Sequence, residues 1–259
     1  MYEFEFEKPS TIAEAVAALA DEDAQALGGG QTLIPTLKQR LAMPSKLVSL
    51  AGIAEMKGVS IADGVLTMGG GATHAEVAAD ACAPLAALAA NIGDPAVRNR
   101  GTLGGSLANN DPAADYPAAM LALKSTIVTN AREIAGDDFF QGLFETALEE
   151  GEIITSVRCE IPEAANYQKF AQPASRFALA GVFVAKYADG VRVAVTGASE
   201  EGVFRWSEAE AALSANFAPD ALAGISVDAG SMIADLHGSK EYRAHLVAVL
   251  AKRAVAALA

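Results

Sequence analysis

The sequence predicts an α+β fold in three parts: two glycine-rich parts in which strands alternate with helices, and a third part with antiparallel strands and helices. At residues 24–38 and again at 65–80, an apolar segment runs into a glycine cluster and then into a helix start. This shared design suggests an α/β plan for these two parts, with two halves that face one ligand, although two copies are too few to define a sequence repeat. Two strand-like runs flank Asp189 and Gly190, a dipeptide that supplies the positive φ angles of a type I′ hairpin turn.

The first part is expected to span residues 1–57. Ser10 is expected to cap a helix in TIAEAVAALADED, because Glu14 falls in the first turn and apolar residues recur at helical spacing. The segment AQALGGGQTLIPTLKQR leads from the glycines into a helix at about Thr32 to Lys38. The apolar run LVSLAGI (47–53) suits a buried strand.

The second part, residues 58–165, repeats the pattern. It predicts a strand at Val65 to Met68, a glycine turn at Gly69 to Gly71 and a helix capped by Thr73. A helix is expected from Pro84 to Asn91, followed by a helix in YPAAMLAL and a strand in KSTIVT.

The end of the second part and the third part differ in pattern. GLFETALEEGEIITSVRCEIP (142–162) predicts a short helix, a turn at Gly151 and a strand. A boundary at about 163–167 then opens the third part, residues 166–259. There FALAGVFVAKY and VRVAVTGA predict a hairpin, and SKEYRAHLVAVLAKRAVAAL predicts an amphipathic helix.

The composition excludes several classes of function. In 259 residues, 52% are apolar and 20% charged, which is typical of a folded protein. A net charge of −13 argues against nucleic acid as a partner, because phosphate binding needs a basic surface. No apolar run approaches the roughly 20 residues that cross a bilayer, and MYEFEFEKPS is acidic where a signal peptide is basic, so we expect a cytoplasmic location and no transmembrane segment.

Metal and nucleophile sites are not predicted. Cys82 and Cys159 are too few for a four-thiolate metal site or an iron–sulfur cluster, and His74, His237 and His245 show no ligand spacing. No Ser/His/Asp set or pair of catalytic carboxylates stands out. We therefore expect no catalytic residue in this chain, and assign the chemistry to an organic cofactor or to a partner.

The glycine clusters have two explanations. They form tight turns that need positive φ, or they let backbone N–H groups approach an anion. A dinucleotide fingerprint of the Rossmann type does not fit, since Leu33 stands where glycine or alanine is needed, and no GxxxxGK[ST] sequence occurs. Three such loops close together favour a long anionic ligand held by another architecture.

The segments ALGGGQTLIPTLKQRLAMPSKLV and IGDPAVRNRGTLGGSLANNDPAADYPAAMLAL resemble the FAD-binding (medium) subunit of the molybdenum hydroxylases, the family of aerobic carbon monoxide dehydrogenase and of the flavin part of xanthine dehydrogenase. IITSVRCEIP and QKFAQPASRFALAGV also look like that family, so the resemblance runs the full length. It implies a two-subdomain FAD-binding fold of the PCMH (vanillyl-alcohol oxidase-like) type, followed by a C-terminal α+β domain, with FAD as the cofactor.

The resemblance also implies which residues bind FAD. Amides of a first loop and hydroxyls of a second would hold the diphosphate, a carboxylate would bind the hydroxyl-bearing part of the nucleotide, and isoleucines would line the cofactor. Family members often carry a lysine near Gln172, a place that Gln172 or Lys169 could take. Asn109 either contacts the cofactor or, with Asn110 and Asp111, bonds the backbone of its own turn. The implied residues are Leu27, Gly28, Gly29, Gly30, Gln31, Thr32, Leu33, Ile34, Ile92, Thr102, Gly104, Gly105, Ser106, Asn109, Asp115, Ile154 and Gln172.

Several side chains near these loops keep two interpretations. Arg98 and Arg100 either pair with the diphosphate or form surface contacts with carboxylates. Phe177 either covers the flavin or is ordinary packing. Gly104 and Gly105 are expected to be glycine because a Cβ would stand where a phosphate oxygen or the ribityl chain lies.

Two hypotheses about function follow. In the first, implied by the resemblance, the chain is the electron-transfer subunit of a molybdenum hydroxylase, an oxidoreductase complex. Electrons pass from a large molybdopterin-binding subunit through a small [2Fe-2S] subunit to FAD, and then to NAD, a quinone or oxygen, in a heterotrimer or a dimer of heterotrimers. In the second, the chain is a free-standing FAD-dependent oxidoreductase on the related fold, which needs an acid/base residue at the flavin.

Overall fold

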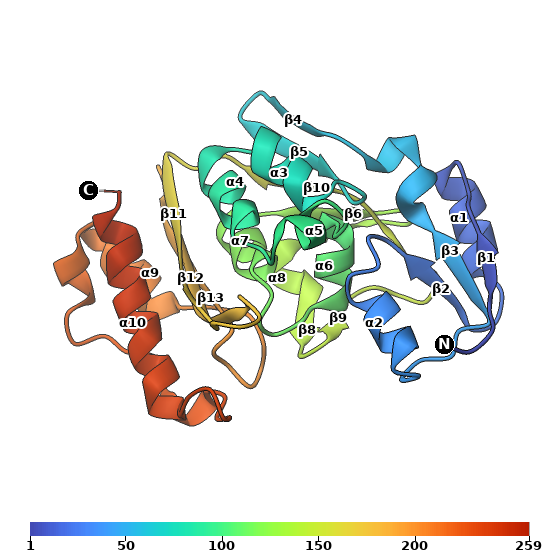
Figure 1. Ribbon diagram of the computed structural model, residues 1–259. Helices are drawn as coiled ribbons and strands as arrows, with labels where there is room; N and C mark the ends of the chain where they lie inside the picture. The colour runs from blue at the N-terminus through green and yellow to red at the C-terminus, as the bar shows by residue number, and fades with distance from the viewer. Residues whose placement is uncertain (259) are drawn as a thin grey trace.

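The computed structural model describes residues 1–258 and has three main sheets arranged along its length, together with a two-stranded hairpin (Figure 1). The N-terminal sheet is parallel, with strands β1 (Glu5–Glu7), β2 (Ala24–Leu27) and β3 (Lys46–Ser49) in the order β1-β3-β2. Helix α1 (Ile12–Leu19) connects β1 with β2, and α2 (Leu33–Lys38) follows the first glycine cluster, as predicted. The α+β class is confirmed.

Two details of the N-terminal part differ from expectation. The cap of α1 is Thr11, whose Oγ1 accepts from the Glu14 N–H at 3.2 Å, while the Ser10 N–H and hydroxyl donate to the Glu14 carboxylate at 2.7 and 2.8 Å. Ser10 therefore closes the first turn from outside. The strand predicted at 47–53 ends at Ser49, because β1 and β2 both end beside it and the chain turns into 3₁₀ helices.

The middle sheet is antiparallel and holds the largest core. Its order is β4-β5-β10-β6-β7, and helices pack over it (Figure 1). The expected strand at Val65 and helix after Thr73 are confirmed, the latter with a full capping box to Glu76. The strands are β4 (Val59–Ala62), β5 (Val65–Gly69), β6 (Thr126–Thr129), β7 (Glu133–Ala135) and β10 (Ile154–Glu160). The helices are α3 (His74–Asp80), α4 (Ala83–Ala90), α5 (Pro95–Arg98), α6 (Leu103–Asn109), α7 (Tyr116–Ala122) and α8 (Gly136–Phe139).

The helix predicted at the start of 142–162 is wrong. A two-stranded hairpin of β8 (Phe140–Gly142) and β9 (Glu145–Thr146) stands there. The Asn110 side-chain amide donates to the carbonyls of Gly142 at 2.8 Å and Glu145 at 2.9 Å. Those carbonyls are thus bound by a distant residue rather than by a helical turn.

The C-terminal sheet is buried on both faces. In β12, Val182 and Val184 pack with the C-terminal helices, whereas the alternating Phe183 and Ala185 belong to the core of the middle part. The sheet order is β11 (Ala164–Ala171), β12 (Ala178–Tyr187), β13 (Gly190–Thr196) and β14 (Phe204–Arg205), covered by α9 (Ser207–Ala215) and α10 (Lys240–Ala256). The predicted hairpin and terminal helix are confirmed.

The turn of this hairpin is not type I′. Gly190 pairs with Tyr187, so the two central residues are Ala188 and Asp189, and neither has a positive φ. The glycine lies one residue later than a type I′ turn requires, and its own φ is +143°. The Asp-Gly pair predicted the hairpin but placed its turn one residue too far along the chain.

Candidate functional site

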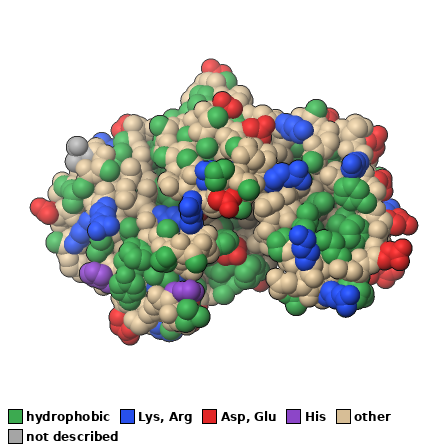
Figure 2. All heavy atoms as spheres, in the orientation of Figure 1, with side chains coloured by type: hydrophobic (Ala, Val, Ile, Leu, Met, Phe, Trp, Pro, Cys, Tyr) green, Lys and Arg blue, Asp and Glu red, His purple; other side chains and the backbone are tan. Residues whose placement is uncertain are grey.

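A cleft of about 820 Å³ lies between the N-terminal and middle parts. In Figure 2 the face of the molecule is indented below its centre, between the right-hand lobe and the rest. Its walls come from the first glycine loop, from the loop after β5, from residues 99–109 and from residues 175–177. Clefts of this size hold cofactor-sized ligands.

Three glycine loops form one wall by packing backbone against backbone. A Cβ on Gly29 would overlap the Arg100 carbonyl, and one on Gly70 would overlap the Ile154 carbonyl. A Cβ on Gly104 would lie 2.7 Å from the Gly70 carbonyl oxygen. The expectation that Gly104 is glycine to leave room for a phosphate is therefore wrong: the space beside it is filled by the neighbouring glycine loop.

The first loop carries free hydrogen-bond donors. Within the described residues, none of the four backbone N–H groups from Gly29 to Thr32 donates to a protein acceptor. Gly30 has a φ of +74°, and the loop leads directly into α2. Successive free amides at a left-handed residue and a helix start form a site for an anion. This cradle fits the diphosphate of FAD.

The second loop has already used most of its amides. The Leu103 N–H donates to Ala72 at 2.9 Å, that of Gly104 to Gly70 at 2.8 Å and that of Gly105 to the Thr102 hydroxyl at 3.2 Å. Gly104 and Gly105 lie inside α6 and neither has a positive φ. What this loop can offer a ligand is hydroxyl groups, from Thr102 and Ser106, which both line the cleft.

The electrostatic balance of the cleft favours an anion. Its carboxylates are engaged: Glu76 in the α3 capping box, Asp111 by the Ala113 N–H, Asp115 by Lys169 and Glu152 by Arg132. Its cations Lys57, Arg100 and Arg176 form no ion pair within residues 1–258. A net charge of −13 therefore does not prevent local binding of a diphosphate.

Asp115 lies at the cleft in a buried cluster. Its carboxylate accepts from the Tyr167 hydroxyl at 2.5 Å and from Lys169 Nζ at 2.9 Å. Burial raises the pKa of Asp115, while Lys169 and the Tyr167 hydrogen bond act in the opposite direction. Of the two residues considered for the family's lysine, Lys169 is the one that reaches the cluster.

His74 lies in the wall behind the second loop. His74 is 5% exposed, and its backbone N–H donates to the Gly101 carbonyl at 2.9 Å. Its ring Nδ1 has no partner within the described residues. Burial, with a smaller contribution from Arg98, lowers the pKa of His74 to about 4. The side chain is neutral at pH 7.

The cleft brings most of the predicted residues together. Ile34 lies instead beside a smaller adjoining pocket, and Gln172, in the turn that precedes Phe177, does not itself line the cleft. Phe177 is 46% exposed at the cleft. The predicted residues that line the cleft are Leu27, Gly28, Gly29, Gly30, Gln31, Thr32, Leu33, Ile92, Thr102, Gly104, Gly105, Ser106, Asn109, Asp115 and Ile154.

Sequence reasoning missed several lining residues. The two interpretations of Arg98 and Arg100 resolve differently: Arg98 donates to the carbonyls of Ile92 and Gly93 at 3.1 Å, whereas Arg100 lines the cleft. Lys57 and Arg176 had no local signal. Gly70 had one, since it belongs to the glycine turn at Gly69 to Gly71, but the predicted site did not include that turn.

Comparisons with known proteins identify the family. The family model described as "FAD binding domain in molybdopterin dehydrogenase" matches residues 2–164. The nicotine 6-hydroxylase medium subunit of Paenarthrobacter nicotinovorans is 35% identical, over 96% of this chain and 95% of its own. The carbon monoxide dehydrogenase medium chain of Afipia carboxidovorans is 32% identical, over 97% and 95%.

Solved structures agree. Quinoline 2-oxidoreductase from Pseudomonas putida 86 matches with a TM-score of 0.88 at 30% identity, over 99% of this chain and 97% of that chain. Reconstituted CO dehydrogenase from Oligotropha carboxidovorans matches with a TM-score of 0.89 at 28% identity, over 98% and 97%. No helix among residues 1–258 has the length and apolar character needed to span a bilayer. By sequence, fold and cleft, the chain belongs to the family of FAD-binding subunits of the molybdenum hydroxylases.

Proposed function

We propose that this chain is the electron-transfer subunit of a multi-subunit molybdenum hydroxylase, together with a large molybdopterin-binding subunit and a small [2Fe-2S] subunit. The observation that supports this most is the match to named medium subunits over nearly the whole length of both chains. The proposal includes a cytoplasmic location and assembly as a heterotrimer or a dimer of heterotrimers. The free-standing flavoenzyme is not favoured, because the two relatives named above are a medium subunit and a medium chain.

The chain's own residues bind and orient the cofactor. The amides of Gly29 to Thr32 would hold the diphosphate, and the Thr102 and Ser106 hydroxyls of the same cleft would add further donors. Asp115, fixed by Tyr167 and Lys169, would accept from a hydroxyl of the nucleotide. When bound, FAD supplies the redox chemistry, taking electrons from the iron–sulfur clusters of a partner and giving them to NAD, a quinone or oxygen.

Reconstitution tests the proposal. The purified chain, loaded with FAD, is mixed with flavin-free large and small subunits, and the flavin absorbance is followed after addition of the organic substrate. We expect reduction only in the complete mixture. Reduction of this chain's flavin by an organic substrate with no partner present would contradict the proposal and support the free-standing enzyme.

A further inference from the structure

One side chain of the middle part belongs to the core of the N-terminal part. Ile153, directly before β10, is 4% exposed and packs in a cluster whose other buried members all come from residues 15–56. It also lines the cleft. Ile153 therefore joins the two parts between which the cleft is formed.

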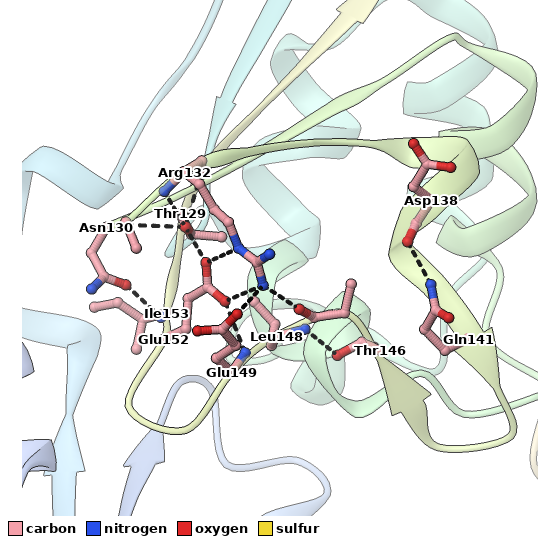
Figure 3. Close-up of polar contacts among 12 residues, drawn as sticks. Thr129, Asn130, Arg132, Asp138, Gln141, Thr146, Leu148, Glu149, Glu152 and Ile153 are labelled. Atoms are coloured by element: carbon pink, nitrogen blue, oxygen red, sulfur yellow. Dashed lines mark hydrogen bonds and ion pairs between the residues drawn. The ribbon is translucent and has the colours of Figure 1, made fainter.

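The backbone of Ile153 is fixed by the turn between β6 and β7. Its N–H donates to Asn130 Oδ1 at 2.8 Å, and the Asn130 N–H donates to its carbonyl at 3.2 Å (Figure 3). These two bonds tie the residue to the middle sheet while its side chain enters the N-terminal core. The position of Ile153 is therefore tied to that of the turn.

The adjacent Glu152 binds the same turn between β6 and β7. Its side chain is 3% exposed and accepts four hydrogen bonds: from the Thr129 hydroxyl at 2.6 Å, from Arg132 Nε and Nη2 at 3.1 Å each, and from the Glu149 N–H at 2.8 Å (Figure 3). Arg132 Nη2 also donates to the Ala147 carbonyl at 2.6 Å. A bidentate arginine on a fully accepting, buried carboxylate gives both strength and a defined geometry.

The next residue, Ile154, connects this segment to the glycine loops. The Ile154 carbonyl fills the space beside Gly70, whose N–H donates to Thr155 at 2.8 Å and whose carbonyl accepts from Gly104. The position of the second glycine loop thus depends on where the segment 152–155 lies.

We propose that Asn130, Arg132 and Glu152 are positioning residues, a clamp that seats Ile153 in the N-terminal core and so sets the width of the FAD cleft. The inference rests on the proposed function only for its ligand, FAD. The Arg132 side chain is 43% exposed, so an isolated surface pair of this kind would contribute little; here the pair fixes the segment whose Ile153 side chain enters the N-terminal core, and its loss should therefore alter binding.

The test compares Arg132→Met with Arg158→Met. Arg158 has the same 43% side-chain exposure and pairs with Glu133 in the same sheet, away from the cleft lining. We expect Arg132→Met to weaken FAD binding about tenfold, measured by quenching of flavin fluorescence. Arg158→Met should stay within twofold, and Arg132→Lys should recover part of the loss.

A distance measurement separates a change in cleft width from loss of fold. Spin labels are placed at Lys38 and Asp138, exposed residues of the two parts, in a Cys82→Ser background. Pulsed electron resonance should give a broader distance distribution for Arg132→Met than for Arg158→Met, both before and after FAD is added. An equally narrow distribution and an unchanged affinity would overturn the clamp.

If Arg132→Met does not fold, Ile153→Val serves in its place. It removes one methyl group from the seated side chain and leaves all the polar bonds intact; it should weaken FAD binding at least threefold, and an unchanged affinity would overturn the clamp. Failure of the unmodified chain to bind FAD would instead count against the proposed function. The distances between the labels would still test the clamp in that case.

Discussion

The first glycine loop, at residues 28–32, and the second, at residues 102–106, look alike in sequence but have different roles in the structure. Among residues 1–258, the backbone N–H groups from Gly29 to Thr32 have no acceptor and their residues line the cleft, whereas the N–H groups of Leu103, Gly104 and Gly105 are bound within the protein. The first loop leaves its donors available for a ligand, and the second packs against the first and supports the wall of the cleft. Glycine richness thus has two causes here: access to an anion and close contact between backbones.

The variant Gly104→Val should have the largest effect, on stability. The valine Cβ would lie 2.7 Å from the Gly70 carbonyl oxygen. It would push the two backbones apart and break the hydrogen bond from the Gly104 N–H to that oxygen. We expect a loss of about 4 kcal/mol in the free energy of unfolding, from overpacking of up to about 3 and a lost hydrogen bond of about 1. Urea denaturation without FAD measures it. If this variant is as stable as the parent and only FAD binding is lost, the second loop is a ligand loop after all.

Hydrogen exchange compares the two loops without any substitution. The amides of Gly29 to Thr32 should exchange rapidly in the FAD-free chain and slow about a hundredfold at FAD concentrations of about 100 Kd. Those of Leu103 and Gly104 should be protected in both states, because their acceptors are in the protein. Equal responses of the two loops to FAD would remove the distinction.

His74, which lies behind the second loop, should make the free energy of unfolding depend on pH. Its pKa is lowered to about 4 in the folded chain from 6.5, so below pH 6.5 the unfolded chain binds a proton there that the folded chain does not. Stability is therefore lost as the pH falls. Between pH 7.5 and 5.0 this residue should account for about 2 kcal/mol.

The variant His74→Leu isolates that contribution. Its free energy of unfolding should fall less than the parent's over the same pH interval, whatever its value at pH 7.5. Identical pH profiles would show that protonation of His74 plays no part.

Thr102 should have the smallest effect. Its hydroxyl accepts from the Gly105 N–H at 3.2 Å and caps α6, so Thr102→Val should cost about 1 kcal/mol in thermal or urea unfolding. Thr102→Ser keeps the hydroxyl and should restore most of the stability. If the serine variant is as unstable as the valine variant, the cap is not what Thr102 contributes.

Local patterns predicted the elements that local contacts stabilise. The helix after the first glycine cluster, the Thr73 cap and the hairpin of β12 and β13 all follow from residues within a few positions of one another. The hairpin at 140–146 could not be predicted in this way, because Asn110, more than 30 residues earlier, binds its carbonyls. Its apolar and acidic sequence favoured a helix in isolation.

The candidate site shows the same limit. The resemblance named the loops that line the cleft, yet it could not show that the space beside Gly104 holds Gly70, since that contact joins segments more than 30 residues apart. Nor could the sequence show that Arg132 forms an ion pair with Glu152, or that Arg98 donates to backbone carbonyls while Arg100 lines the cleft. The division at 1–57, 58–165 and 166–259 remains our proposal.

The two-sided burial of the C-terminal sheet affects how the molecule can be divided. The family match ends at residue 164, but Phe183 and Ala194, which follow it, complete the core formed by Leu121 and Tyr116. A chain cut after residue 164 would leave that apolar surface open to water and prone to aggregation. We therefore expect residues 2–164 not to fold on their own, and to unfold together with the C-terminal sheet in a single cooperative transition.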